Sequence, residues 1–359
     1  METLLRGTIS QRILKQVVYV HILRPQTLAS TDESIAKAAY ILRNDGVVAF
    51  PTETVYGLGA RFDSEKAIKK VFLAKGRPSD NPLIVHISDL DELSSVAQEV
   101  PVIAEKLMLS FWPGPLTIVL PKTAAVPKVA TGGLETVGVR MPAHAMALSL
   151  IRAVGLPLVA PSANLSGRPS PTSAAHVTED LGDRIDGILD GGDTELGLES
   201  TVVRVVDDKI VVLRPGCVTR EMLADIGEVE VESPSDDSNS TPAAPGMKYT
   251  HYAPRAQVSL VVGQAVESLP RLARELQKQG MSVAVVAFEG TLSQLQGMVK
   301  MSLGEHGGTD TAAKRLYSHL READHLGVDH VLVEGIKAEG LGEAIMNRLT
   351  KAATCVIGG

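Results

Sequence analysis

Hydrophobic positions in the first two thirds of the chain follow helical spacing in some segments and strand spacing in others. The segment DESIAKAAYILRNDG, residues 32–46, places Ile35, Ala38 and Leu42 on one helical face and ends in a glycine. The same patterns predict further helices at SEKAIKKVFLA, 101–111, HAMALSLIRAVG and TSAAHVTEDLG, and strands at VVAF, PLIVHI, LTIVL, VGVRM, LPLVAPS, GILDGG, STVVRVV and KIVVLR. We therefore expect an α/β domain with a twisted mixed sheet over residues 28–232.

A second pattern begins after a polar stretch. Residues 233–246, SPSDDSNSTPAAPG, contain no apolar residue larger than alanine and cannot build a core, so they are expected to form a linker. From residue 257, strands at QVSLVVG, MSVAVVAF and VDHVLVEG are separated by helices of crossover length. This order predicts a small Rossmann-like, three-layer α/β/α domain with a parallel sheet over residues 255–359.

The ends of the chain and its composition narrow the class of protein. Residues 1–27 are expected to be an N-terminal extension, and their apolar run VVYVHIL is too short to span a membrane. The net charge of −7 argues against an extended surface for nucleic acid. The two cysteines, Cys217 and Cys355, cannot form a disulfide framework, and no zinc-type spacing occurs, so a reducing cytoplasm is the expected location.

Polar stretches at strand ends are the candidates for chemistry. No GxxxxGK[ST] or complete GxGxxG motif occurs. Instead, polar residues interrupt the pattern at PTETVYGLGA, AKGRPSDNPLIVH, TVGVRMP, APSANLSGRPSPT and LESTVV, with LRPG close behind, which is the usual placement of a ligand crevice in an α/β sheet. In the second stretch Lys75 and Arg77 lie on a segment stiffened by prolines, which indicates either a rigid anion-binding loop or an ordinary surface loop.

These motifs, in this order and together with FWPGPLTIVL, closely resemble the YrdC-like domain, and PGMKYTHYAP followed by a small α/β domain resembles its longer, two-domain members. Those proteins are threonylcarbamoyl-AMP synthases. The resemblance covers about residues 28–359 and implies that L-threonine, bicarbonate and ATP give L-threonylcarbamoyladenylate, pyrophosphate and water, which would make the chain a nucleotidyltransferase. It also implies a partner machinery that transfers the threonylcarbamoyl group to the adenosine next to the anticodon of tRNA.

The resemblance assigns an anion-binding, catalytic set of four residues. The matching positions here are Lys75, Arg77, Ser162 and Asn164. Attack of a carbamate oxygen on the α-phosphorus of ATP builds negative charge on phosphate oxygens, so fixed cations and hydroxyl or amide donors are what the transition state requires. ATP-binding positions implied in the same way are Arg77, Asn81, Thr136, Ser162, Ser170, Arg214 and Tyr249, although turn and strand-end capping is an alternative for Asn81, Thr136, Ser170 and Arg214.

L-threonine must be held by its carboxylate and hydroxyl while its amine stays available for reaction. Arg140 lies in an apolar strand, where a guanidinium is costly without an anion partner, and it could clamp a carboxylate through two parallel bonds. The resemblance assigns it this role and completes the pocket with Thr54, His86, Ser200 and the backbone of Ala160. Whether His86 also acts as a base is left open at this stage.

The segment after the linker, KYTHYAP, is too aromatic and basic for a spacer. Residues 233–254 are therefore expected to act as linker and active-site lid, with Tyr249 contacting the nucleotide. Attachment of these aromatic residues to the second domain is the alternative.

Other functions remain open from the sequence. Mg²⁺ is expected to accompany ATP on its phosphates, without a dedicated protein metal site. An RNA-binding or regulatory module is the main rival, with Lys75, Arg77, Arg140 and Arg168 as a local basic patch, and direct tRNA binding stays undecided. A carbamoyl-transfer module of the hydrogenase-maturation kind is less favoured, because the acylphosphatase and zinc-finger segments of those proteins have no counterpart here.

Overall fold

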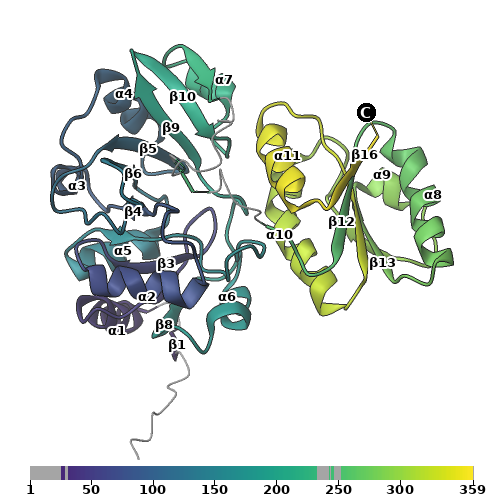
Figure 1. The fold of residues 1–359 in the computed structure, drawn as a ribbon, viewed down its shortest axis with the longest axis horizontal. Coiled ribbons are helices and arrows are strands. Elements are labelled where there is room, and N and C mark those ends of the chain that lie inside the picture. Colours follow the sequence, from purple (N-terminus) through teal and green to yellow (C-terminus); the bar gives the residue numbers. More distant parts are fainter. Residues whose placement is uncertain (1–25, 29–30, 233–241, 243, 246–251, 359) are drawn as a thin grey trace, which may run out of the picture.

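The computed structural model describes residues 26–28, 31–232, 242, 244–245 and 252–358, which form two α/β domains lying side by side (Figure 1). The first domain contains a mixed sheet and the second a parallel one, as the hydrophobic pattern predicts. Tyr249 and most of the expected lid lie outside the described residues.

The sheet of the first domain has eleven strands among the described residues, in the order β1-β8-β2-β3-β7-β4-β6-β5-β9-β10-β11. Parallel and antiparallel pairs both occur, with β4 parallel to β6 and antiparallel to β7. The bounds of the strands are β1 Gln26–Leu28, β2 Val48–Phe50, β3 Gly57–Arg61, β4 Ile84–His86, β5 Leu116–Pro121, β6 Thr136–Arg140, β7 Leu158–Val159, β8 Gly187–Leu189, β9 Thr201–Val206, β10 Lys209–Arg214 and β11 Val229–Val231.

Helices cover this sheet with two separate apolar cores. One core packs residues of α1 and α5 against β2, and the larger core joins α2, α4 and α6 to the central strands. Side-chain caps begin several helices, as where Thr31 accepts from the backbone N–H of Ser34. The helices are α1 Asp32–Arg43, α2 Glu65–Lys75, α3 Leu93–Val96, α4 Val102–Phe111, α5 Ala145–Val154, α6 Ala174–Leu181 and α7 Arg220–Ala224, with a 3₁₀ turn at Leu90–Glu92.

The second domain is a five-stranded parallel sheet in the order β14-β13-β15-β12-β16. Helices α10 and α11 cover the face toward the first domain, and α8 and α9 cover the other face (Figure 1). Its elements are β12 Gln257–Val261, α8 Ala265–Lys278, β13 Val283–Ala287, α9 Glu289–Leu292, β14 Val299–Ser302, α10 Thr309–His325, β15 His330–Glu334, α11 Leu341–Ala352 and β16 Cys355–Ile357.

The two domains share one apolar cluster. Val55 and Leu198 of the first domain and Tyr252 of the connecting segment pack with residues of α10 and α11. Ion pairs surround this cluster, including Arg321 with Asp180 at 2.8 Å and Arg220 with Glu343 at 2.8 Å. The second domain is therefore docked on the first through both apolar and charged contacts.

Several local predictions need correction. Lys75 is the last residue of α2 rather than part of a loop, and Gly76 ends that helix with φ +60°, a conformation that favours glycine. The turn-rich stretch PTETVYGLGA contains strand β3, and β1 begins at Gln26, inside the expected N-terminal extension. Strands β14 and β16 extend the three strands expected in the second domain to five.

Candidate functional site

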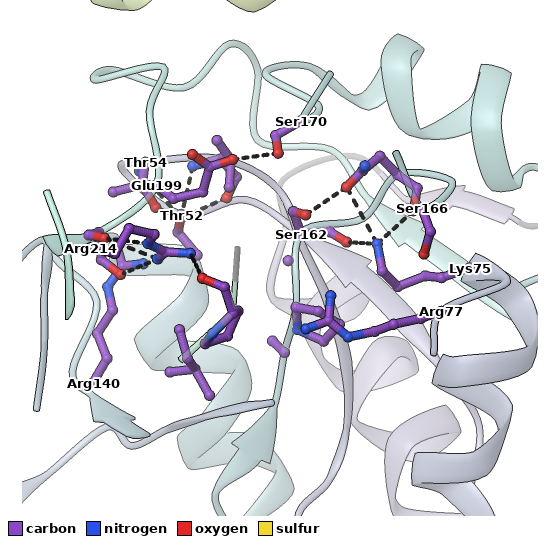
Figure 2. Close-up of a pocket in the computed structure, with 18 of the residues that line it drawn as sticks. Thr52, Thr54, Lys75, Arg77, Arg140, Ser162, Ser166, Ser170, Glu199 and Arg214 are labelled. Atoms are coloured by element: carbon purple, nitrogen blue, oxygen red, sulfur yellow. Dashed lines mark hydrogen bonds between the residues drawn. The ribbon is translucent and has the colours of Figure 1, made fainter. Parts of the chain in front are cut away.

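A pocket of about 710 Å³, including its open mouth, lies in the first domain near the domain boundary. Among the described residues, every one expected to bind substrate lines it except Asn81 and Thr136. Figure 2 shows Arg140 and Arg214 on one side of this pocket and Lys75 and Arg77 on the other. Segments far apart in sequence thus place two groups of cations around one space.

Lys75 is held by the loop that carries the SxN motif. Its side chain comes from the end of α2 and is buried, with a residue exposure of 2 %. Its Nζ donates to the backbone oxygens of Ser162 and Asn164, each at 2.6 Å, and to Asn164 Oδ1 at 3.3 Å. Burial, with the nearby Arg77 cation, lowers the pKa of Lys75 below its usual value. The ammonium group of Lys75 therefore holds the loop of the SxN motif in place, and it also lines the pocket.

Ser162 and Asn164 continue this network, and Arg77 is held separately. Ser162 Oγ donates to Asn164 Oδ1 at 2.5 Å, while Asn164 Nδ2 donates to the backbone oxygens of Leu165 and Arg168. Arg77 also lines the pocket, and its guanidinium donates hydrogen bonds within its own loop, from Nε to Asn81 O at 3.2 Å and from Nη2 to Pro82 O at 2.9 Å. Backbone oxygens thus hold the two cations, Lys75 and Arg77, beside the pocket, where they could stabilise the negative charge of a phosphate.

Arg140 has an anion partner that the sequence did not reveal. Its Nη2 lies 2.7 Å from Glu53 Oε1, and its Nε donates to the backbone oxygen of Gly114 at 3.2 Å. Both side chains of the ion pair are buried. The cost of burying the guanidinium is therefore reduced within the protein, and the pair fixes the group at the pocket wall.

His86 is a neutral imidazole in this site. It ends β4, is buried, and lies edge-on to Phe50 with ring centroids 6.3 Å apart. Burial, with a contribution from the Arg140 cation, lowers its pKa to about 3. Such a weak base is a poor acceptor for the proton of an ammonium group, so the burial of His86 disfavours the base role that the sequence left open.

The arginine side of the pocket also carries hydroxyl groups. Thr54 Oγ1 lies 2.8 Å from Thr52 Oγ1, and Ser200 Oγ lies 2.8 Å from Thr117 Oγ1. Arg214, at the end of β10, donates from Nη2 to both Ser200 O and Ser200 Oγ. Small polar groups here could hold the carboxylate and hydroxyl of an amino acid.

Two residues expected at the nucleotide lie beside the main pocket. Thr136, the first residue of β6, lines a smaller, mostly apolar cavity that shares Ile84 and Pro245 with the main pocket. Asn81 is buried on the Arg77 loop, and its Oδ1 has no hydrogen-bond partner among the described residues. The position of Tyr249 is not described, but Pro245 and Tyr252, on either side of residues 246–251, both line the pocket.

The most prominent pocket residue that sequence reasoning missed is Glu199. It precedes Ser200 in the LESTVV motif, so the signal was present but only the serine was assigned. Although burial opposes ionisation, Arg348 and Arg214 hold the pKa of Glu199 at about 2. The LRPG glycine, Gly216, packs against this segment, because a Cβ there would lie 2.8 Å from Glu199 O.

The basic patch expected for an RNA-binding module is not an exposed surface. Lys75 and Arg140 are buried in the pocket. Arg168 is paired with Glu179, Asp180 and Asp324. Electrostatic binding of a nucleic-acid backbone needs accessible cations, so this arrangement favours a small ligand.

Neither a metal site nor a membrane-spanning helix is found in the part of the chain that the structure describes. No group of three or more His, Cys, Asp or Glu side chains there could hold a metal ion. None of the helices in this part of the chain is long and apolar enough to cross a bilayer. Mg²⁺ bound through ATP therefore remains a proposal.

Comparison with known proteins places the chain in a family. A family model described as "Telomere recombination" matches residues 40–216, and one described as "Threonylcarbamoyl-AMP synthase, C-terminal domain" matches residues 218–354. Threonylcarbamoyl-AMP synthase of Bacillus subtilis is 49% identical over 91% of this chain and 94% of its own length. The chain belongs to the threonylcarbamoyl-AMP synthase family.

Other members of the threonylcarbamoyl-AMP synthase family match both domains. The Pyrococcus abyssi protein of this name is 48% identical over 88% of this chain and 93% of its own length. The crystal structure of P. abyssi Sua5 complexed with L-threonine has a TM-score of 0.87 and 44% identity, covering 93% of this chain and 99% of that chain. The two-domain architecture is thus shared with a solved family member.

Proposed function

We propose that this protein is a threonylcarbamoyl-AMP synthase that converts L-threonine, bicarbonate and ATP into L-threonylcarbamoyladenylate, pyrophosphate and water. The observation that carries the proposal is one pocket with Arg140 and Arg214 on one side and the cluster of Lys75, Ser162 and Asn164 on the other. Family membership and the L-threonine complex of P. abyssi Sua5 support it. On this reading the enzyme is a nucleotidyltransferase, because it transfers the adenylyl group of ATP.

The arginine side suits the amino acid. Arg140, oriented by Glu53, can donate hydrogen bonds to the threonine carboxylate from the side that faces the pocket. Thr54, Ser200 and the Ala160 backbone can form hydrogen bonds with the threonine hydroxyl and amine. Once the threonine ammonium has lost a proton to solvent, the amine nitrogen attacks the carbon of bicarbonate, and loss of water leaves a carbamate. Neutral His86 contributes shape and a hydrogen-bonding nitrogen rather than general-base catalysis.

The lysine side suits the phosphates. A carbamate oxygen attacks the α-phosphorus, and the bond from that phosphorus to the β-phosphate bridging oxygen breaks to release pyrophosphate. Lys75 and Arg77 are the cations that would stabilise the growing negative charge, and Ser162 Oγ could donate to a phosphate oxygen only by turning away from Asn164 Oδ1, to which it donates in this structure. Thr136 borders only a narrow apolar cavity next to this pocket, which leaves the main pocket as the place for the nucleotide, and Mg²⁺ would bind through the phosphates and water.

The product is a mixed anhydride of a carbamic and a phosphoric acid, so it is reactive toward water. We propose that a threonylcarbamoyl-transferase machinery consumes it to modify the adenosine next to the anticodon of tRNA. The pocket residues Pro245 and Tyr252, at the two ends of residues 246–251, support a role of the connecting segment in covering the product.

Omission of substrates tests the reaction. Pyrophosphate release by the full chain should require threonine, bicarbonate and ATP together, because the carbamate must form before it can attack the α-phosphorus. Formation of the adenylate should be followed by mass spectrometry in the same samples. Undiminished pyrophosphate release in bicarbonate-depleted buffer, or release without the adenylate, would refute the proposed function. Serine in place of threonine is the matched control for recognition of the side chain.

A further inference from the structure

Residues 166–170 lie between the pocket and the second domain. Ser166, Gly167 and Ser170 line the pocket, so one side of this segment faces the ligand space. Its other side contacts residues that come much later in the sequence. The Ala253 backbone N–H, just before the second domain, donates to Gly167 O at 2.9 Å.

Helix α10 holds the same segment from behind. Arg321, which is fully buried, donates from Nη2 to Pro169 O at 2.5 Å and to Asp180 Oδ2 at 2.8 Å. Arg168 of the segment pairs with Asp324 of the same helix, Nη2 to Oδ2 at 3.3 Å. One guanidinium of the second domain thus fixes the backbone immediately before Ser170.

Glu199 joins the side chain of Ser170 to the second domain. Ser170 Oγ donates to Glu199 Oε1, and Tyr317 OH of α10 donates to Glu199 Oε2 at 2.9 Å. Arg348 Nε of α11 donates to the same oxygen at 2.8 Å. All of these side chains are buried, so the hydrogen bonds are shielded from water.

The direction of the Ser170 hydrogen bond has a consequence for the ligand. An ionised carboxylate only accepts hydrogen bonds, so the serine must donate its single proton to Glu199. The lone pairs of Ser170 Oγ are then left to accept from a group in the pocket. A ribose hydroxyl or the amino group of adenine is a donor of this kind.

We propose that Tyr317 and Arg321 of the second domain are positioning residues for the nucleotide, acting through Glu199 and Pro169 on Ser170. The inference rests on the proposed function, since it takes ATP as the ligand. The second domain would therefore set the affinity for ATP without touching it.

Replacement of the Tyr317 hydroxyl is the sharpest test. Tyr317→Phe keeps the ring that stacks on Tyr252, with centroids 5.4 Å apart, and removes only the hydrogen bonds to Glu199. We expect the apparent KM for ATP, and the dissociation constant of ATP measured by calorimetry, to rise about fivefold, as loss of one hydrogen bond would produce. The KM for threonine should stay within about twofold of the wild-type value.

A second variant addresses the backbone contact. Arg321→Lys keeps a cation for Asp180 but cannot bond Asp180 and Pro169 O in the same forked geometry. It should raise the KM for ATP at least as much as Tyr317→Phe. If this variant does not fold, Tyr317→Phe alone decides the question.

Arg220→Ala is the matched control for a weaker domain interface. It removes the interdomain pair with Glu343, and neither residue lines the pocket. Its KM for ATP should be unchanged. If Tyr317 had a purely structural role, Tyr317→Phe would lower the melting temperature. The KM values for ATP and threonine would then either stay at their wild-type values or change by the same factor.

The outcomes separate the inference from the proposed function. An unchanged ATP dissociation constant in Tyr317→Phe, or the same rise in Arg220→Ala, would overturn the positioning role. Wild-type protein that binds ATP without making the adenylate would refute the proposed function, and the calorimetric comparison of the variants would still decide the inference.

Discussion

Glu53 and Arg140 form a buried ion pair at the wall of the pocket, with Oε1 2.7 Å from Nη2 and both side chains 5% exposed. Neither carboxylate oxygen of Glu53 makes a hydrogen bond to another described group. Glu53 is itself anchored through its backbone oxygen, which accepts from Leu196 N at 2.8 Å. The carboxylate therefore serves chiefly to compensate and orient the guanidinium.

Removing the charge of Glu53 should destabilise the protein. Glu53→Gln leaves the Arg140 cation buried without its counter-charge, so we expect the free energy of unfolding to fall by about 3 kcal/mol. Urea unfolding followed by circular dichroism measures the change. Asp63→Asn is the control, because it removes an ion pair with Arg61 that is about one-third exposed and should cost less than about 1 kcal/mol. Equal losses in the two variants would contradict the argument.

Arg140→Lys should separate the two substrates. Lysine keeps the charge opposite Glu53 but cannot offer two parallel donors to a carboxylate. We expect the apparent KM for threonine to rise by about tenfold or more while the KM for ATP changes little. Initial rates of pyrophosphate release at varied threonine and varied ATP provide both values. A similar rise in both would mean that Arg140 serves the nucleotide or the fold.

Much of the fold could be predicted from the sequence because its main elements have clear periodicity. The helix at 32–43 and the strands at 48–50 and 84–86 follow directly from their apolar spacing. Short edge strands such as β14 and β16 were missed, because runs of three or four residues are too short to show a period. Lys75 was expected in a loop, although its position at the end of α2 is set by the glycine that follows it.

The candidate site was predictable where motif residues face the pocket and unpredictable where partners come from distant segments. Motif resemblance located Lys75 and Ser162, but the hydrogen bonds between them depend on how α2 packs against the loop. The LESTVV motif places Glu199 next to Ser200, but its contacts could not be predicted, because its partners Tyr317 and Arg348 follow more than a hundred residues later. Tertiary packing, rather than local spacing, decides such contacts.

His86 should make the stability of the protein sensitive to acid. Its pKa is about 3 in the folded protein and about 6.5 as the ordinary value, so the unfolded chain binds a proton between these limits and the native state does not. The stability that neutral His86 contributes is therefore fully present above pH 6.5 and is lost as the pH falls toward 3. From pH 7 to pH 5 this group should remove about 2 kcal/mol from the free energy of unfolding.

Denaturant unfolding of His86→Gln at the two pH values tests this linkage. The variant should lose about 2 kcal/mol less than the wild type between pH 7 and pH 5, whatever its stability at pH 7. His306→Gln, at an exposed histidine of the second domain, is the control for loss of an imidazole elsewhere. An identical pH dependence in His86→Gln and the wild type would show that the imidazole takes up its proton in the folded protein at the same pH as in the unfolded chain.

Lys75 and Arg77 should respond differently to substitution, although they are two residues apart. Lys75→Met leaves the buried carbonyls of Ser162 and Asn164 without their donor, at a cost of about 1–3 kcal/mol for each unsatisfied group. We expect a melting temperature roughly 5–10 °C lower by the usual scaling for domains of this size. Arg77→Ala removes bonds within a partly exposed loop and should lower it by only about 2 °C.

Both substitutions should nevertheless reduce turnover by about two orders of magnitude, because each removes a cation that faces the phosphate side of the pocket. Differential scanning fluorimetry gives the melting temperatures, and pyrophosphate release at saturating substrates, measured at a temperature where both variants are folded, gives the rates. If Lys75→Met melted like the wild type, the ammonium would not be the fixed support of the loop that its three hydrogen bonds indicate. If Arg77→Ala kept wild-type turnover, its segment would be an ordinary surface loop, and the charge that stabilises the transition state would have to come from Lys75 and the hydroxyl and amide donors alone.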